Sequence, residues 1–413
     1  MTVPIPADWC VKPLGELARV YSGGTPLRSV GSYWNGPIPW VTTAEIDFGT
    51  INATRQSITE LGLKASAAKI APAGTVLIAM YGQGKTRGKS AILGVPAAMN
   101  QACAAVEVPP GLSAAFLLQY LSAQYDSIRA LSNSGGQENL SGEIVKKIPI
   151  ILPSEPEQQR ISMILHDVDA LISSLSRLLV KRQSTRQGLM QQLFSARARL
   201  PGFTEHLREM SLRDIGSSYG GLTGKSKEDF GHGTATFITF LEVMNHTRLS
   251  GRQLERVRVK KSEHQNRVLR GDVLFNGSSE TPEEVALSAV VAFDPEPTTY
   301  LNSFCFGFRI KRTDIADPTF LAYLFRSNPG RTLIAPLAQG ATRYNIAKTK
   351  LLDVALALPD LEEQRAIAAV MNDCEDEISA TAMRLDKARA TKQGMMQQLF
   401  TGRTRLPAGE VAS

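Results

Sequence analysis

The sequence predicts an α+β protein in which two globular domains alternate with two long helices. Three observations support this prediction: an internal repeat offset by 206 residues, a heptad pattern near the end of each repeat, and short β-like runs elsewhere. With 413 residues, the chain is long enough for two or three domains of ordinary size.

The repeat is clearest near the end of each half. GLMQQLFSARARLP at residues 188–201 matches GMMQQLFTGRTRLP at 394–407, and EQQR at 157–160 matches EEQR at 362–365. Weaker matches continue through each half, including Asn139 with Asn345, and the offset changes along the chain. This pattern indicates a duplicated framework whose loops have diverged.

Apolar residues in the repeated segments alternate steps of three and four, which indicates a heptad seam on two long helices. A helix from Glu157 to Ser195 would extend about 58 Å. Five prolines are expected just outside the helices: Pro153, Pro156, Pro201, Pro359 and Pro407. The predicted seam consists of Ile161, Leu165, Val168, Ile172, Leu175, Leu179, Ile367, Met371, Cys374, Ile378, Leu385 and Met395.

The charges of the two helices predict how they pair. In each helix, acidic residues precede a basic stretch, so parallel pairing would place acid against acid. Antiparallel pairing instead places residues 373–377 opposite 181–182, and residues 387–389 opposite 167–169. Because flanking charges select orientation, we expect an antiparallel coiled coil with a pseudo-two-fold axis through its middle.

The rest of the chain mixes strand-like and helix-like runs. VTTAEI, GTVLIAM, ERVRVK, GDVLF and LSAVVAF have the composition of strands, and PTFLAYLFRS that of a helix capped by Asp317. We expect globular domains over residues 1–152 and 203–357, and spacer helices over 153–202 and 358–413.

Composition excludes several classes of protein. No apolar run approaches the eighteen residues of a membrane span, and the amino terminus lacks the pattern of a signal peptide, so we expect a cytoplasmic chain. The four cysteines lie far apart, which predicts reduced thiols and no metal site. The net charge of +7 is compatible with a polyanionic partner without identifying one.

Catalytic motifs are not found in the sequence. Three Gly-Lys-Ser/Thr tripeptides lack the glycine that a phosphate-binding loop needs five positions earlier. Asp317-Pro318-Thr319-Phe320 lacks the second proline of an adenine methyltransferase motif. We therefore predict no catalytic residues.

Polar, glycine-rich loops with cations are the candidate binding elements. Lys and Arg in such loops can contact phosphates, and Gln and Asn can contact base edges. One pair of loops is cationic, and a second pair precedes the two long helices. The candidate DNA-binding residues are Gln83, Lys85, Thr86, Arg87, Lys89, Gln137, Asn139, Lys225, Ser226, Lys227, Thr342, Arg343, Tyr344 and Asn345.

The order of domain, EQQR helix, second domain and EEQR helix resembles the DNA-specificity subunit of type I restriction-modification systems. The resemblance covers essentially the whole chain. SYWNGPIPWVTT at 32–43 and GLTGKSKEDFGHGTATFITFLE at 221–242 look like the starts of that family's two target-recognition domains. GATRYNIAKTKLLDVALALPDLEEQRAIA at 340–368 is similar to the approach to its second conserved helix, whereas the first half lacks the Thr-Arg-Tyr.

The resemblance implies a function without chemistry in this chain. Each domain would recognise one half of a bipartite, asymmetric site in double-stranded DNA, and the coiled coil would set the half-site spacing. The implied partners are two modification subunits, which carry S-adenosylmethionine and methylate adenine, and restriction or motor subunits. The chain itself would hold no cofactor and contact no membrane.

Two alternatives remain open on the sequence alone. One is DNA adenine methyltransferase activity within this chain, and the other is a coiled-coil scaffold without sequence specificity.

Overall fold

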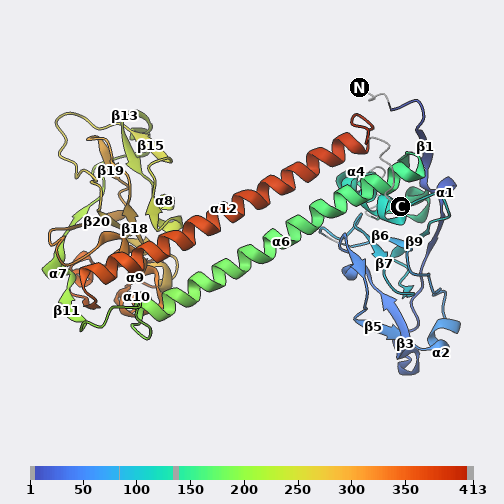
Figure 1. The fold of residues 1–413 in the computed structure, drawn as a ribbon, viewed down its shortest axis with the longest axis horizontal. Coiled ribbons are helices and arrows are strands. Elements are labelled where there is room, and N and C mark those ends of the chain that lie inside the picture. The colour runs from blue at the N-terminus through green and yellow to red at the C-terminus, as the bar shows by residue number, and fades with distance from the viewer. Residues whose placement is uncertain (1–4, 83, 134–138, 407–413) are drawn as a thin grey trace. The chain divides into compact units, whose positions relative to one another are not determined.

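The chain forms two compact units in the computed structural model, which describes residues 5–82, 84–133 and 139–406. Unit 1 combines the chain up to Ser176 with the chain from Met383 onward, and unit 2 is Arg177–Ala382. The two long helices, α6 (Glu155–Phe194) and α12 (Leu361–Leu399), are each divided near their middle, so both contribute to both units (Figure 1). Each unit therefore contains one globular domain and half of each long helix.

The domain of unit 1 is built on a five-stranded and a three-stranded sheet. The large sheet has the order β2 (Arg19–Ser22), β9 (Cys103–Glu107), β6 (Val76–Ala79), β7 (Ser90–Leu93), β4 (Thr50–Ile51). The small sheet has the order β5 (Gln56–Ile58), β3 (Trp34–Val41), β8 (Ala98–Met99), and β1 (Cys10–Pro13) pairs with β10 (Pro149–Leu152). The helices are α1 (Leu14–Leu17), α2 (Glu60–Lys64), α3 (Ala114–Ala123), α4 (Tyr125–Ala130) and α5 (Gly142–Lys146), with 3-10 turns at Gly31–Tyr33, Thr43–Glu45 and Leu131–Asn133.

The domain of unit 2 repeats this strand order. Its large sheet is β12 (Gly216–Gly220), β20 (Cys305–Ile310), β16 (Val273–Asn276), β18 (Ser288–Val291), β14 (Arg248–Leu249). Its small sheet is β15 (Leu254–Val257), β13 (Phe230–Ile238), β19 (Thr299–Leu301), and β11 (Arg208–Ser211) pairs with β22 (Ala355–Leu358). An additional pair joins β17 (Ser278–Ser279) to β21 (Tyr344–Asn345). The helices are α7 (Leu212–Ile215), α8 (Phe240–Asn245), α9 (Pro318–Arg326), α10 (Asn328–Ile334) and α11 (Lys348–Leu352), with 3-10 turns at Lys227–Asp229, Pro282–Glu284 and Ala335–Leu337.

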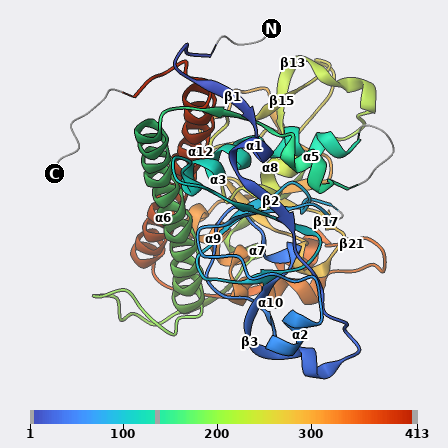
Figure 2. The same ribbon diagram turned by 90° about the vertical axis from the view of Figure 1, so that its right-hand side faces the viewer.

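Equivalent strands thus occupy equivalent places in both sheets of the two units, which confirms the predicted α+β fold with a duplicated framework. In unit 1 the small sheet and α2 lie at the end of the domain away from β1 (Figure 2). In unit 2 the small sheet likewise lies away from β11 (Figure 1).

A close backbone approach explains the glycine that follows β2 and β12. Gly23 and Gly221 donate equivalent backbone hydrogen bonds to the carbonyls of Cys103 and Cys305. A Cβ atom at Gly23 would come within 2.1 Å of the Met99 carbonyl oxygen, and one at Gly221 within 2.0 Å of that of Asn302. Only glycine fits there, so the match between Tyr21-Ser22-Gly23 and Tyr219-Gly220-Gly221 reflects the framework.

The long helices run antiparallel to each other within each unit. In unit 1, the Lys392 ammonium lies 2.7 Å from the Asp169 carboxylate. In unit 2, Arg182 pairs with Glu377 at 3.4 Å and Arg186 with Glu375 at 3.5 Å. Residue numbers rise along one helix as they fall along the other, as the charge pattern predicts. All twelve residues of the predicted seam are buried or half-buried.

The predicted charge contacts differ from the structure at one end. Residues 387–389 were expected opposite 167–169, but Asp169 is paired with Lys392. Arg389 instead lies 3.6 Å from Asp386 of its own helix. The helical register therefore places the opposing cation one turn further along α12.

A buried carboxylate joins the start of each long helix to the end of the other. Glu363, whose side chain is 0% exposed, accepts hydrogen bonds from Nε of Arg199 at 2.7 Å and from a second guanidinium nitrogen of the same side chain. Glu157, 3% exposed, accepts from Nε of Arg405 at 2.7 Å and from the Trp9 indole at 3.0 Å. These contacts account for the repeated Glu and for the repeated Arg of ARLP and TRLP.

The glutamine that follows each buried glutamate anchors the neighbouring loop. Gln158 accepts a hydrogen bond from the Ser113 backbone N–H at 2.8 Å, and Gln364 accepts one from the Asp317 N–H at 2.9 Å. Each amide nitrogen donates to the carbonyl of the proline five residues earlier. Glu157-Gln158 is therefore structurally equivalent to Glu363-Gln364, at an offset of 206. Direct alignment of EQQR with EEQR would instead pair Glu157 with Glu362.

The leucine and phenylalanine of each MQQLF segment enter a domain core. Phe400 lies edge-on to Phe116 and Tyr120, at ring-centroid distances of 5.6 and 5.4 Å. Phe194 lies 5.1 Å from Phe320 in the other core. Burial of two such large side chains attaches the end of each helix to a domain.

Two predicted details are wrong. VTTAEI is not a strand beyond Val41, because Glu45 accepts hydrogen bonds from the backbone and hydroxyl of Thr42 and thereby closes a 3-10 turn. Pro156 lies inside α6, where the first turn tolerates proline because its N–H needs no helical partner.

Replacing the buried carboxylate should weaken unit 2. We expect Glu363→Gln to lower the free energy of unfolding by about 2–4 kcal/mol, because Arg199 loses its buried charge partner. Chemical denaturation of the full chain measures this. The adjacent exposed Glu362→Gln is the matched control, and equal effects of the two changes would contradict the assigned role.

The antiparallel arrangement predicts a specific crosslink. In a Cys374→Ala background, a short bismaleimide should join Arg182→Cys to Glu377→Cys within one chain, because these positions face each other. The pair Arg182→Cys and Ala388→Cys, which parallel helices would bring together, is the control. Mass spectrometry that found only the second crosslink would rule out the antiparallel pairing.

Candidate nucleic-acid interface

In unit 1, the predicted cationic loop connects β6 to β7. The backbone N–H of Gly88 donates to the Ala79 carbonyl at 2.9 Å, and Gly88 has the left-handed φ of 87° that this tight return requires. Lys85 is exposed at the loop tip, and its carbonyl accepts a hydrogen bond from the Tyr125 hydroxyl at 2.7 Å. The loop therefore presents a solvent-exposed cation from a fixed backbone.

The other side chains of this loop are more enclosed. Thr86 and Arg87 are half-buried. The Lys89 ammonium lies 2.6 Å from Asp47 and 5.6 Å from the centroid of the Phe48 ring. Lys89 is thus already paired with a carboxylate.

The structure brings Asn139 to the same loop. The N–H of Leu140 donates to the Met80 carbonyl at 3.0 Å, which holds the exposed Asn139 beside the end of β6. Gln83 and Gln137 lie outside the described residues. The first loop and the segment before α6 consequently form one polar surface.

The equivalent surface of unit 2 contains the predicted residues 342–345. The N–H of Ile346 donates to the Gly277 carbonyl at 3.2 Å, as Leu140 does to Met80 in unit 1. Thr342, Arg343 and Asn345 are exposed, and Tyr344 is half-buried in the β17–β21 pair.

One exposed aromatic residue beside this surface is not among the candidate residues predicted from the sequence. Phe304, 58% exposed, lies in the turn between β19 and β20, and its carbonyl accepts the Gly277 N–H at 2.7 Å. The Arg343 guanidinium lies 5.4 Å from its ring centroid. The equivalent residue of unit 1 is Ala102, so only a comparison of the two halves inside NQAC and NSFC could have revealed it.

The second cationic loop, at residues 224–227, is not the counterpart of residues 83–89. It lies between β12 and β13, whereas the loop at 83–89 lies between β6 and β7, which correspond to β16 and β18. The two loops are similar in composition, which predicts that they are equivalent. The strand order shows that this prediction is wrong.

The side chains of this loop are also less available than predicted. The Lys225 side chain is 3% exposed, forms an ion pair with Glu263 and donates to the Arg258 carbonyl at 2.7 Å. The hydrogen bond that Lys225 donates to the Glu263 carboxylate lowers the pKa of Glu263. Its buried position argues against a DNA contact by Lys225, because the ion pair would have to break first.

Ser226 and Lys227 occupy a capped turn. The Ser226 N–H and then the Arg258 guanidinium lower the pKa of Asp229 to about 2, so this carboxylate stays ionised and holds the turn. Lys227 is exposed on it.

A second aromatic and cationic cluster lies in the small sheet of unit 1. The Arg28 guanidinium lies 4.4 Å from the Trp34 ring and 5.2 Å from the Trp40 ring, and donates to the Gln56 side chain at 2.8 Å. Stacking fixes the direction of an otherwise flexible cation. In the sequence, the two tryptophans of SYWNGPIPW are the feature that points to this cluster.

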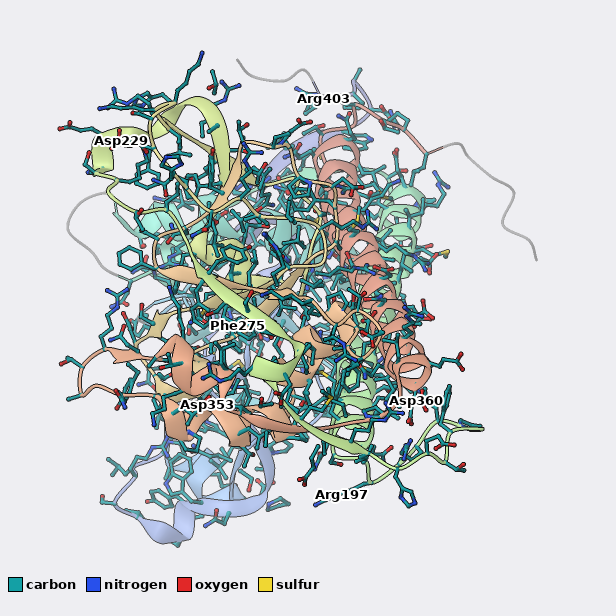
Figure 3. The ribbon with its side chains drawn as sticks, turned by 90° about the vertical axis from the view of Figure 1, so that its left-hand side faces the viewer. Arg197, Asp229, Phe275, Asp353, Asp360 and Arg403 are labelled. Atoms are coloured by element: carbon teal, nitrogen blue, oxygen red, sulfur yellow. The ribbon has the colours of Figure 1, made fainter. Side chains whose placement is uncertain are left out.

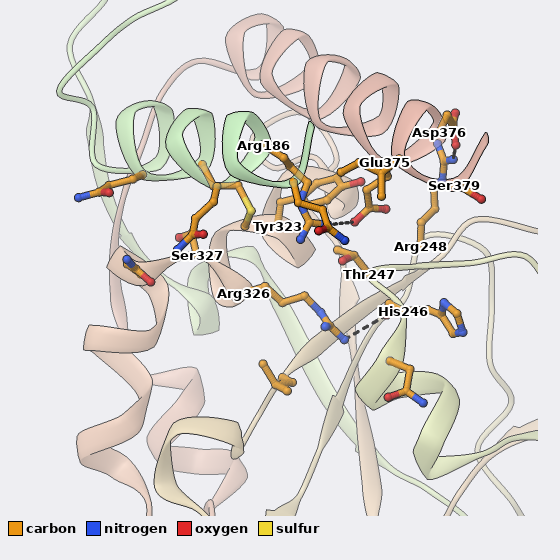
Figure 4. A pocket seen from close by; sticks show the side chains of 18 residues that line it. Arg186, His246, Thr247, Arg248, Tyr323, Arg326, Ser327, Glu375, Asp376 and Ser379 are labelled. Atoms are coloured by element: carbon orange, nitrogen blue, oxygen red, sulfur yellow. Dashed lines mark hydrogen bonds and ion pairs between the residues drawn. The ribbon is translucent and has the colours of Figure 1, made fainter. Parts of the chain in front are cut away.

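A cleft of about 690 Å³ in unit 2 lies between its domain and its halves of the long helices (Figure 4). The half-buried Arg326 guanidinium donates to the carbonyls of Ser288 and Val243, at 2.5 and 2.6 Å, and to two further carbonyls. Loss of solvent around it lowers its pKa to about 10. Arg248 pairs with Asp376 across the cleft. The Arg326 bonds therefore lie within the domain, and the Arg248–Asp376 pair ties the domain to α12. The polar groups of the cleft are thus engaged in internal contacts.

Metal-site and membrane geometries are not found in the described part of the chain. No three His, Cys, Asp or Glu side chains gather as possible ligands over residues 5–82, 84–133 and 139–406. None of the helices within these ranges is long and apolar enough to span a membrane.

Comparison with known proteins reveals curated relatives. The chain is 30% identical over 175 residues to the MjaIX type I restriction enzyme specificity subunit of Methanocaldococcus jannaschii, covering 41% of this chain and 40% of that protein. It is 29% identical over 184 residues to the EcoR124I/EcoR124II specificity subunit of Escherichia coli, covering 44% and 45%. These two matches span less than half of each relative. The MjaVIII specificity subunit of M. jannaschii is 21% identical over 418 residues, covering 97% and 94%.

Solved structures share the fold. A chain from a type I R-M system aligns with a TM-score of 0.58 and 18% identity, covering 97% of this chain and 100% of that one. The S subunit of a type I restriction-modification system from M. genitalium aligns with a TM-score of 0.57 and 12% identity, covering 96% of both.

The profile of a protein family matches both halves of the chain. It is described as the type I restriction modification DNA specificity domain, and it matches residues 6–181 and 205–387, which together include most of both halves. The chain belongs to the type I restriction-modification DNA specificity family.

Proposed function

We propose that this chain is the sequence-specific DNA-binding subunit of a type I restriction-modification complex and recognises a bipartite, asymmetric site. Each globular domain would contact one half-site. The observation that carries the proposal is the identical strand order of the two domains combined with different side chains on their equivalent loops. A shared framework provides the same mode of docking, and different loops provide two different half-sites.

The candidate contacts follow from exposure. Lys85 and Asn139 in unit 1, and Lys227 and residues 342–345 in unit 2, have solvent-accessible polar groups on loops anchored by backbone hydrogen bonds. Fixed loops of this kind can direct side chains toward phosphates or base edges with little further ordering.

We assign the spacing of the half-sites to the two long helices. Each helix contributes to both units, and the buried glutamates hold both helix ends in register with a domain. A change in helix length would then change the separation of the half-sites along the duplex.

The chemistry is assigned to partner proteins. Two modification subunits, with S-adenosylmethionine as their cofactor, would methylate adenine, and restriction subunits would join them in the cytoplasm. Asp317 supports the absence of methyltransferase chemistry in this chain, because its carboxylate caps α9 by accepting the Phe320 N–H at 2.9 Å.

Exchange of one domain should change one half-site. We expect that replacing residues 1–150 with those of a family member of different specificity alters one half of the methylated sequence and preserves the other half and the spacing. Methylome sequencing of cells that express the chain and its modification partner measures this.

Three results would contradict the proposal. Changes in both half-sites would exclude modular reading. Methylation by the purified chain alone would place the activity within it, and binding without sequence preference in the presence of the partner would indicate a scaffold.

A further inference from the structure

The segment from Arg252 to Arg270 carries more positive charge than its place in the fold requires. It contains seven Lys or Arg residues and two Glu residues, a net charge of +5. Its counterpart in unit 1, residues 53–71, has three and one, a net charge of +2. Each segment supplies the equivalent edge strand, β15 or β5, of the three-stranded sheet in its own unit, so the additional cations are not needed to build that sheet.

Some of these cations have structural partners. Arg258 pairs with Asp229 at 2.9 Å, and Arg270 pairs with Asp294 at 2.9 Å. Five others are exposed and have no carboxylate partner among the residues that the structure describes. One of them, Arg256, donates to the Gly233 carbonyl at 3.4 Å. The remaining four are Arg252, Lys260, Lys261 and Arg267. We call these four, with the exposed Lys227, the basic strip.

The backbone beneath the basic strip is held in place. The Arg258 N–H donates to the Asp229 carbonyl at 2.8 Å, the Thr223 N–H donates to the Gln265 side chain at 3.0 Å, and Asn266 donates to the Gly220 carbonyl at 3.0 Å. These bonds pack residues 258–266 against the loop that contains Lys227. Asp229, which is labelled in Figure 3, shows where this loop lies in the structure.

Cations that lie along one segment without carboxylate partners repel one another in the free protein and gain most from an extended polyanion. Duplex DNA offers one charge per about 1.7 Å of helix axis and releases bound counterions when Lys and Arg replace them. We propose that the basic strip binds the phosphate backbone of DNA beside the half-site contacted by unit 2. This inference rests on the proposed function and adds the contacts that hold the duplex without reading its sequence.

The test measures how binding depends on salt. The first probe is a duplex that contains the recognition sequence found by methylome sequencing. The second is a duplex of the same length and composition in which that sequence is scrambled. Fluorescence anisotropy gives the affinity of the full-length chain, with its modification partner present at the same concentration throughout, for both probes between 50 and 300 mM NaCl. The variant combines Arg252→Gln, Lys260→Gln and Lys261→Gln, and its matched control combines Arg208→Gln, Lys311→Gln and Lys350→Gln, which are exposed cations elsewhere in unit 2.

We expect the strip variant to lower the slope of log affinity against log salt by about 2–3, since each lost phosphate contact contributes about 0.9. Both duplexes should weaken by similar factors, so the preference for the site should persist. The control variant should keep the wild-type slope. A variant that replaces the same positions with the other cation, Arg252→Lys, Lys260→Arg and Lys261→Arg, should also keep it.

An unchanged slope in the strip variant, or an equal fall in the control variant, would overturn the inference. Loss of the site preference without a change of slope would also overturn it, because the strip would then contact bases. Equal binding of both duplexes by the unmodified chain with its modification partner would contradict the proposed function, whereas the slopes would still decide whether the strip binds phosphate.

Discussion

The buried pairs of Glu157 with Arg405 and of Glu363 with Arg199 determine how this chain is organised. Each pair joins the first turn of one long helix to the segment that follows the end of the other. A buried carboxylate is unfavourable without its partner, so each domain needs the end of the helix from the other half of the chain. Each compact unit is consequently assembled from both halves, and the antiparallel arrangement of the helices follows directly.

The two units share one framework of strands and packing residues, and they differ in the side chains on their loops. The paired strand orders, the glycines after β2 and β12, the glutamines that anchor the neighbouring loops and the phenylalanines that end the helices occur in both units. The side chains on the loops do not match: Phe304 stands where the first unit has Ala102. Conservation of packing with divergence of exposed loops suits two related domains that bind different half-sites.

Residue type was a poor guide to which cations are available for binding. Lys225 and Lys89 lie in polar, glycine-rich loops, yet both are paired with carboxylates, and Lys225 is almost completely buried. Lys260 ends the run ERVRVK that the sequence predicts as a strand, and Arg252 and Lys261 lie just outside it, yet all three are exposed. A lysine near a glycine is equally compatible with a phosphate contact and with an internal ion pair, and only the position of the nearest carboxylate separates the two.

The sequence by itself determined the duplication, the α+β class, the seam of the long helices and their antiparallel direction, because these depend on periodicity and charge order along the chain. Only the tertiary structure decided which repeated residues are equivalent, since insertions changed the offset and strand order had to restore the correspondence between the loops. It also assigned the roles of Glu157 and Glu363, whose partners lie 248 and 164 residues away. Contacts at such separations leave no local pattern, because they form only when the two halves pack together.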